Sequence, residues 1–279
     1  FVSTTVLSAA AVTAALFTGC SISGPALPAV IEAEPGNSVF FEEPAPKEIL
    51  LSSTHPKADI YYTTDGSEPT PDTGITYTGP ITIDDTSRIK AKAYIDEKSV
   101  SETTEFTYIF YTLLAVPEYQ TAAAPYLDIN FGYFGSSDTP SPVGLSLYRI
   151  GRYEIPKLLY DTVREWAKDH GYGLSEGEPD DAAGYPARNL TWFDAAKWCN
   201  AFTEYYNSVK GTDLEPVYYR DINHETVYEA GQKELTRDHL KWDADGFRLP
   251  TEPEFEYAAR RTQTEAGEAA LSDVDRYSG

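Results

Sequence analysis

The stretch GFRLPTEPEFEYAARR, residues 246–261, predicts a short helix that begins just after Thr251. Thr251 and Glu254 stand three residues apart, the spacing of a capping box, and Pro253 is tolerated in a first turn. The helix macrodipole stabilises carboxylates near the N-terminus. Three are present: Glu252, Glu254 and Glu256. Helix capping accounts for these acids, and an acid/base or metal role is the less favoured interpretation.

A helix upstream is predicted between Pro156 and Gly171. Proline is favoured in the first turn of a helix, and glycine is favoured just after its end. Between them, side chains recur at helical spacing: Leu159, Val163, Trp166 and His170. We expect a helix over about 157–169, with His170 as a capping or surface residue at its C-terminal end. A catalytic role for His170 is the alternative.

Another helix is predicted to start at Thr191, which can act as its cap, with Asp194 in the first turn. One apolar stripe follows: Ala195, Trp198, Cys199, Phe202 and Tyr206. Such a stripe is typical of a helix face that packs on a core. We therefore expect Cys199 to be a buried, unreactive thiol. A disulfide with a cysteine beyond Gly279 is the alternative.

Residues 37–110 have a different pattern, in which short β-rich runs are separated by turn residues. In the run 88–95, one set of side chains is apolar: Ile89, Ala91, Ala93 and Ile95. Lys90, Lys92 and Tyr94 alternate with them, which is the period of a half-buried strand. Several such strands without a helical period predict a small all-β sandwich.

Composition limits the possible partners. The chain has 22 Lys and Arg against 44 Asp and Glu, a formal net charge of −22, so nucleic acid is not an expected partner. The two cysteines, Cys20 and Cys199, provide neither a disulfide scaffold nor a cysteine zinc cluster. The 21 tyrosines indicate that most of the chain folds.

The N-terminal segment resembles a bacterial lipoprotein signal. An apolar run, residues 6–17, ends through Thr18 and Gly19 at Cys20, and it is too short to span a bilayer as a helix. We expect residues 1–19 to be a signal peptide and Cys20 to carry the lipid that anchors the chain. Residues 20–36 then form a flexible tether. A buried apolar helix that ends in a core cysteine is the alternative.

The segment YYTTDGSEPT, residues 61–70, resembles the chitobiase/beta-hexosaminidase C-terminal domain. YTGPI at 77–81 and IKAKA at 89–93 follow in the same order, so the resemblance covers nearly all of residues 37–110. It implies an accessory spacer or glycan-contacting module without catalytic activity. Tyr61 and Tyr62 could stack on sugar rings, but core packing is the favoured role for at least one of them, because adjacent strand residues face opposite sides.

Three blocks in residues 113–279 resemble the formylglycine-generating enzyme family, also called sulfatase-modifying factor. They are LYRIGRYEI at 147–155, YPARNLTWFDAAKWCN at 185–200 and RLPTEPEFEYAAR at 248–260. The last is close to the family's RLPTEAEWEYA, with Pro253 for Ala and Phe255 for Trp. The resemblance implies a mixed α/β, irregular fold related to C-type lectin-like domains, incomplete at its C-terminus here.

Members of that family oxidise a sulfatase cysteine to formylglycine with molecular oxygen and copper, and they carry structural calcium. The resemblance places the copper-binding cysteines and the calcium ligands after the RLPTE helix. Neither set can therefore be assigned to a residue of this chain, and we assign no catalytic or metal-binding residue.

Two main functions remain open. The first is a lipid-anchored, extracytoplasmic protein of the cell envelope that binds glycan, an exported protein or another envelope component without catalysis. The second is an enzyme that makes formylglycine, with its catalytic cysteines in a part of the domain after Gly279. A structural envelope protein without a small ligand is a third possibility. Fold resemblance alone does not decide among them.

Overall fold

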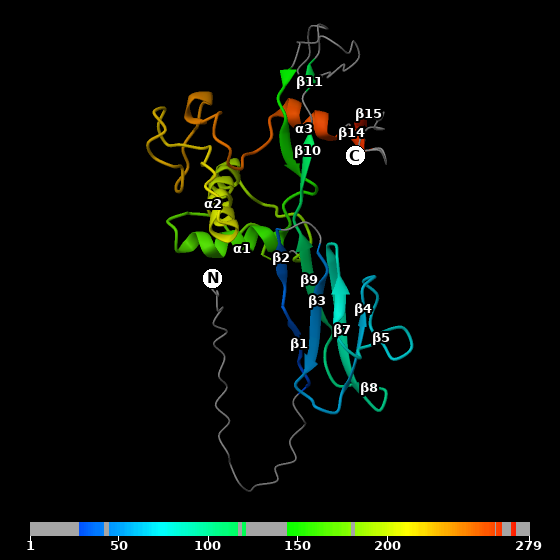
Figure 1. The fold of residues 1–279 in the computed structure, drawn as a ribbon. Coiled ribbons are helices and arrows are strands. Elements are labelled where there is room, and N and C mark those ends of the chain that lie inside the picture. Colours follow the sequence, from blue (N-terminus) through cyan, green and yellow to red (C-terminus); the bar gives the residue numbers. More distant parts are fainter. Residues whose placement is uncertain are drawn as a thin grey trace.

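The computed structural model describes residues 28–41, 45–116, 119–120, 144–179, 182–259, 261–263 and 269–271. The predicted signal peptide and the predicted lipidation residue Cys20 lie outside these residues. The prediction of a flexible tether over residues 20–36 is wrong for its last part, because Ile31–Glu34 form a strand that pairs with Lys47–Ser53 and Ile31 is buried in the apolar core. Within the described residues the chain is rich in β-strands and has a few helices, and it forms a β-unit followed by a unit that contains α1, α2 and α3 (Figure 1).

Two sheets make up the first unit. The smaller sheet is antiparallel and has the order β1 (Ile31–Glu34), β3 (Lys47–Ser53), β6 (Ile81–Ile83). The larger sheet has the order β2 (Ser38–Phe40), β9 (Thr104–Phe110), β7 (Ser87–Ile95), β4 (Asp59–Thr63), β5 (Ile75–Thr76), and β8 (Lys98–Ser99) pairs with β7. Only β2 and β9 run parallel in the larger sheet; its other pairs are antiparallel.

The two sheets share one apolar core. Ile49 and Ile81 from the smaller sheet and Ile89 and Phe106 from the larger one belong to the same buried cluster. The alternation predicted for β7 is confirmed, because Ile89, Ala91 and Ala93 are completely buried. Tyr94, on the opposite face, is also buried, with only 7% of its surface exposed.

The predicted helices are present. α1 spans Lys157–Lys168, and Pro156 is its N-cap rather than a first-turn residue. α2 spans Trp192–Lys210, and the capping box of Thr191 and Asp194 at its start is formed. α3 spans Glu252–Ala259, and a short 3-10 helix, η2, spans Arg237–His239. Gly171 has a φ of 85°, a backbone conformation that glycine adopts without steric cost.

The second unit also contains short antiparallel strand pairs. These are β10 (Leu113–Val116) with β13 (Tyr148–Gly151), β11 (Tyr119–Gln120) with β12 (Gly144–Leu145), and β14 (Arg261–Gln263) with β15 (Ala269–Leu271). Its core packs α1 against α2 through Leu159, Val163 and Phe202. Among the residues that the structure describes, no helix is both long and apolar enough to cross a membrane.

Phe41 joins the two units. It directly follows β2, and its ring lies 5.9 Å from the ring of Phe202, 6.0 Å from Tyr205 and 5.8 Å from Tyr206, all on α2. Tyr111 directly follows β9 in the β-unit, and its ring centre lies 6.0 Å from that of Phe41. The β-unit is therefore packed on the helical unit, with β2 beside the helices in Figure 1.

Candidate functional site

Tyr61 and Tyr62, the residues considered for sugar stacking, lie on opposite faces of β4. Tyr62 packs against the core of the β-unit and contacts Tyr77 edge to face, with ring centres 6.5 Å apart. Tyr61 lies on the outer face, half-buried, with its ring 5.6 Å from Tyr94 and perpendicular to it. One tyrosine thus has the packing role expected from strand alternation, and a sugar-binding role for either stays a prediction.

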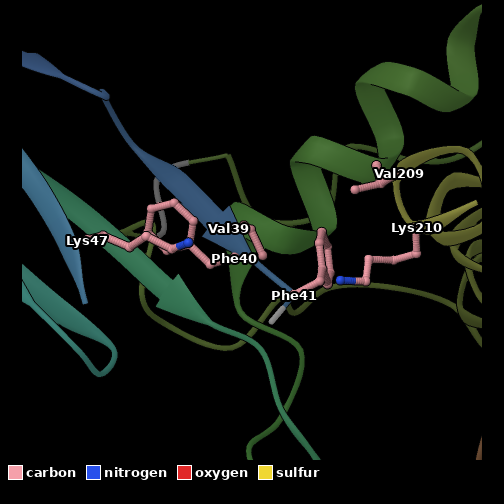
Figure 2. A pocket seen from close by; sticks show the side chains of 6 residues that line it. All are labelled: Val39, Phe40, Phe41, Lys47, Val209 and Lys210. Carbon is pink, nitrogen blue, oxygen red and sulfur yellow. The ribbon is translucent and has the colours of Figure 1, made fainter. Parts of the chain in front are cut away.

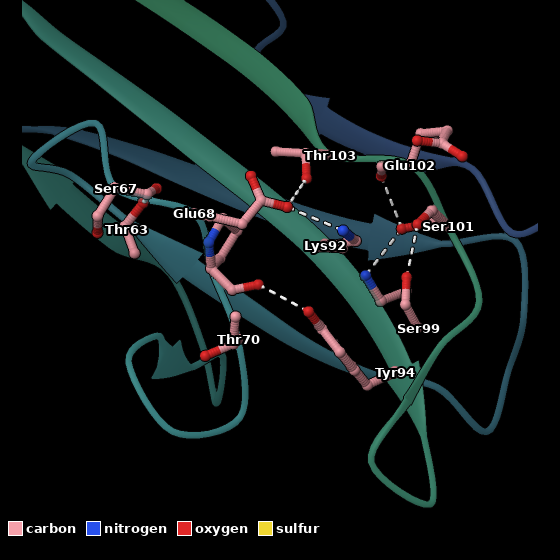
Figure 3. Close-up of polar contacts among 12 residues, drawn as sticks. Thr63, Ser67, Glu68, Thr70, Lys92, Tyr94, Ser99, Ser101, Glu102 and Thr103 are labelled. Atoms are coloured by element: carbon pink, nitrogen blue, oxygen red, sulfur yellow. Dashed lines mark hydrogen bonds and ion pairs between the residues drawn. The ribbon is translucent and has the colours of Figure 1, made fainter.

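Hydrogen bonds hold the loop after β4 against the outer face of the larger sheet (Figure 3). The ammonium of Lys92 donates a hydrogen bond of 2.8 Å to Glu68, which also accepts one from Thr103. The Tyr94 hydroxyl donates to the carbonyl of Pro69 at 3.0 Å. Hydrogen bonds from Lys92 and Thr103 hold the pKa of Glu68 below its usual value. These contacts explain why Tyr94 is buried on an outer face.

Cys199 is a free, buried thiol in the core of the second unit, as the stripe on α2 predicted. Burial raises its pKa to about 12, so the thiol stays protonated at neutral pH. A copper site of the family type needs two thiolate ligands, and a buried, protonated Cys199 does not fit that role. In the part of the chain that the structure describes, no group of three or more His, Cys, Asp or Glu side chains could hold a metal ion.

The carboxylate cluster at α3 is explained by capping. Glu254 accepts hydrogen bonds from both terminal nitrogens of Arg248, at 2.7 and 2.6 Å, and from the backbone and hydroxyl of Thr251. Burial acts to raise the pKa of Glu254, but the hydrogen bonds from Arg248 and Thr251 outweigh it and lower that pKa. Glu252 is exposed, and the side chain of Glu256 lies outside the described part.

A second acidic group lies where α1, α2 and the segment after Tyr228 meet. Tyr172 is 94% buried, and its hydroxyl lacks a hydrogen bond of good geometry. Burial raises the pKa of Glu204, and the neighbouring charge of Glu229 adds to this effect.

His170 caps the end of α1 through Nδ1, 2.7 Å from the carbonyl of Trp166, as expected.

A groove lies at the junction of the two units (Figure 2). Its volume is about 410 Å³. It is lined by Val39, Phe40, Phe41, Lys47, Val209 and Lys210. The ammonium of Lys47 lies 5.3 Å from the centre of the Phe40 ring, and in Figure 2 the nitrogen of Lys210 points toward Phe41. The groove was not predicted, because one wall comes from residues 39–47 and the other from the end of α2, which lies far along the chain from them.

Comparison with known families decides the assignment of the second unit. A sequence profile described as "Sulfatase-modifying factor enzyme 1-like domain" matches residues 89–276. The chain belongs to this family. Residues 49–108 match a second family, described as "Fn3 associated". The prediction of a separate upstream module is thus confirmed, although this family's name differs from that of the chitobiase domain that the segment resembles. Both matches cover residues 89–108, and strand pairing places this overlap in the larger sheet of the β-unit.

Among individual proteins, this sulfatase-modifying-factor family member is similar to "Chaperone protein LppX" from Paenibacillus barcinonensis. The two are 34% identical over 130 residues, which cover 44% of this chain and 40% of that protein. The alignment thus spans less than half of the curated relative. The solved structure titled "Crystal Structure of CarF" aligns with 53% of this chain and 56% of that chain, at 22% identity and a TM-score of 0.40, which is too low to define a common fold.

Proposed function

We propose that the chain is a lipid-anchored, extracytoplasmic binding protein of the sulfatase-modifying-factor family, and that it engages an envelope component without catalysis. An exported polypeptide is the favoured ligand, and glycan is the other candidate. Lipid on Cys20 would hold the chain at the membrane surface. The proposal includes a β-sandwich that starts at β1, before the expected bounds of 37–110, and a C-type-lectin-like fold for residues 113–279.

The observation that carries the proposal is the groove between the units. It combines apolar side chains with two ammonium groups, as binding sites commonly combine an apolar lining with a few polar groups. Its volume of about 410 Å³ is within the range of ligand pockets. The packing of Phe41 against α2 holds its two walls in place.

The similarity to a protein named a chaperone supports a polypeptide ligand. Chaperones bind client proteins, and a chaperone held at the membrane surface would meet polypeptides as they leave the cytoplasm. This argument rests on 130 aligned residues and on the name of the relative. The substrate of the whole protein therefore belongs to the proposal.

The oxidase stays the second candidate, because the family match itself favours it. That activity would require two copper-binding cysteines, and Cys199 has the environment of a core residue. A chain that binds copper and converts the cysteine of a sulfatase peptide to formylglycine would replace the binding proposal with this one.

An aggregation assay tests the binding proposal. An exported protein from the same cells is unfolded in denaturant and diluted into buffer with or without the purified chain, and light scattering is recorded. We expect scattering to fall as the chain is added, with saturation near equal amounts. Scattering that is unchanged even with the chain in excess would overturn a polypeptide ligand, and a glycan array would then test the other candidate.

Anchoring is tested separately. We expect the wild-type chain in the membrane fraction, with acyl groups on Cys20 by mass spectrometry, and Cys20→Ala in the soluble fraction. A Cys20→Ala chain that remains in the membrane fraction, together with an unacylated wild type, would remove the lipid anchor from the proposal.

A further inference from the structure

The chain is held firmly where it enters the β-unit. The backbone nitrogen of Ala29 donates a hydrogen bond of 2.8 Å to the carbonyl of Val100, and Ala29 forms a parallel bridge with Ser101. Val30 donates from its backbone nitrogen to the Thr54 hydroxyl at 2.9 Å and accepts from the Thr54 backbone nitrogen at 3.0 Å. The chain therefore enters the β-unit beside the end of the β7–β8 hairpin and the turn after β3.

This entry point lies at the end of the β-unit that is remote from the helices. β9 starts just after Ser101 and runs to Tyr111, which packs with Phe41 at the contact between the units. The seven residues of β9 span roughly 20 Å. Figure 1 shows the same arrangement, with β8 at one end of the β-unit and the helices α1 and α2 beyond the other. About one strand length therefore separates Ala29 from the helical unit.

The strand pairing shortens the chain between the predicted lipid and the first fixed residue. Because pairing starts at Ala29, this chain runs from Cys20 to Ala29 and not to residue 36. Fully extended, it reaches about 30 Å, whereas a chain from Cys20 to residue 36 would reach about 55 Å. Residues 20–31 include no Asp, Glu, Lys or Arg, so charge does not hold this part of the chain away from an anionic lipid surface.

We propose that the turns at the Ala29 end of the β-unit face the lipid bilayer, and that the helical unit is directed away from it. This inference rests on the proposed function, because it takes the lipid on Cys20 as the anchor. For the reverse orientation, the chain after Cys20 would have to run alongside the whole β-unit, which takes up most of its reach of about 30 Å. The exposed residues at this end include Val30, Pro56, Lys57, Asp96, Glu97 and Lys98.

Energy transfer from the protein to the membrane tests this orientation. The lipidated full chain is purified, labelled with a fluorophore maleimide at one introduced cysteine, and incorporated into phosphatidylcholine vesicles that contain a rhodamine lipid. Lys98→Cys places the label on β8, and Glu252→Cys places it at the start of α3; both positions are exposed. Cys199 is buried and its pKa is raised, so it does not compete for the reagent. A lipidated wild type that takes up no label verifies this, and circular dichroism verifies that each variant is folded.

The short chain to Ala29 predicts unequal transfer. We expect transfer from the Lys98→Cys label to be at least about twice as efficient as from the Glu252→Cys label, because the Ala29 end stays within about 30 Å of the anchored residue. A matched variant has about 20 Gly and Ser residues inserted after Leu27, which adds about 25 Å of flexible chain. In this variant the two efficiencies should become more similar.

Equal transfer from both labels without the insertion, or stronger transfer from the label on α3, would overturn the proposed orientation. A ratio that the insertion leaves unchanged would overturn the short chain as its cause.

The outcomes separate this inference from the proposed function. If mass spectrometry finds no acyl group on Cys20, the anchor and the orientation both fail, and ligand binding is then judged by the aggregation assay alone. If Cys20 is acylated but the two labels transfer equally, the orientation fails and the lipid anchor stands.

Discussion

The burial of Cys199 predicts that this thiol is unreactive. It lies on the core-facing stripe of α2, where burial raises its pKa to about 12. We predict that Cys199 reacts with a thiol reagent at pH 8 at least about 100-fold more slowly in the folded chain than in denaturant, because the protonated, buried thiol is a poor nucleophile. A Cys20→Ala background removes the other thiol. Equal rates in both states would contradict the buried position.

Glu204 is an acidic residue whose pKa is raised by burial in the fold. Tyr172, Glu229 and His170 are its charged or titratable neighbours. An acid whose folded pKa exceeds its unfolded pKa favours folding when protonated. That contribution is present below the unfolded pKa and is lost as the pH rises through the folded pKa.

We therefore predict that Glu204→Gln raises the Tm at pH 7.5 and changes it little near pH 4, measured by thermal unfolding. Glu165→Gln is the control. The hydrogen bond from Lys168 lowers the pKa of Glu165, so this substitution should not raise the Tm at pH 7.5. A Glu204→Gln chain that is less stable than the wild type at pH 7.5 would show that the ionised carboxylate is needed by the fold.

At the scale of elements, the start of α3 depends on Glu254. We predict that Glu254→Gln lowers the free energy of unfolding by about 2 kcal/mol, because it weakens the two hydrogen bonds from Arg248 and the cap on Thr251. The folded pKa of Glu254 is lowered, so its stabilisation is present above the unfolded pKa and is lost as the pH falls through the folded pKa. Urea denaturation at pH 7 measures the change. Glu252→Gln, at an exposed position where only the helix macrodipole acts on the charge, should cost no more than about 0.5 kcal/mol; equal losses in both variants would contradict this role of Glu254.

The helices were predicted well from sequence because their signals are local. Thr191, Asp194 and Gly171 act within a few residues of their own positions, and the structure confirms all three. The alternation in β7 is likewise a property of one strand. The parallel pairing of β2 with β9 has no local signal, because its two strands are about 70 residues apart and few residues long. The groove was not predicted either, because its two walls come from segments that are far apart in sequence.

The contact between the units depends on Phe41. We predict that Phe41→Ala costs about 3 kcal/mol, because it removes the ring that packs on Phe202, Tyr205 and Tyr206. The β-unit and the helical unit should then unfold in two steps by calorimetry, whereas the wild type unfolds in one. Phe255→Ala is the control, since its ring is exposed and its removal should change stability by less than about 0.5 kcal/mol. A single transition with unchanged Tm would contradict this role of Phe41.

At the scale of the whole molecule, the strong excess of acidic residues predicts charge repulsion. A net charge of −22 on 279 residues destabilises the compact state through self-repulsion, and salt screens it. We predict that the Tm rises by several degrees when NaCl is increased from about 0.02 to about 0.3 M, with most of the change at the lower concentrations. A Tm that falls over this range would mean that attractive ion pairs, such as Lys92 with Glu68, outweigh the repulsion.

The central claim is that this member of the sulfatase-modifying-factor family binds exported polypeptide rather than oxidising it. The most direct measurement incubates the copper-loaded full chain with an unfolded fragment of an exported sulfatase in oxygenated buffer. It then records both retention of the fragment on the chain and the mass of its cysteine residue. The account predicts saturable retention with the cysteine unchanged; conversion to formylglycine, or no retention at all, would contradict it.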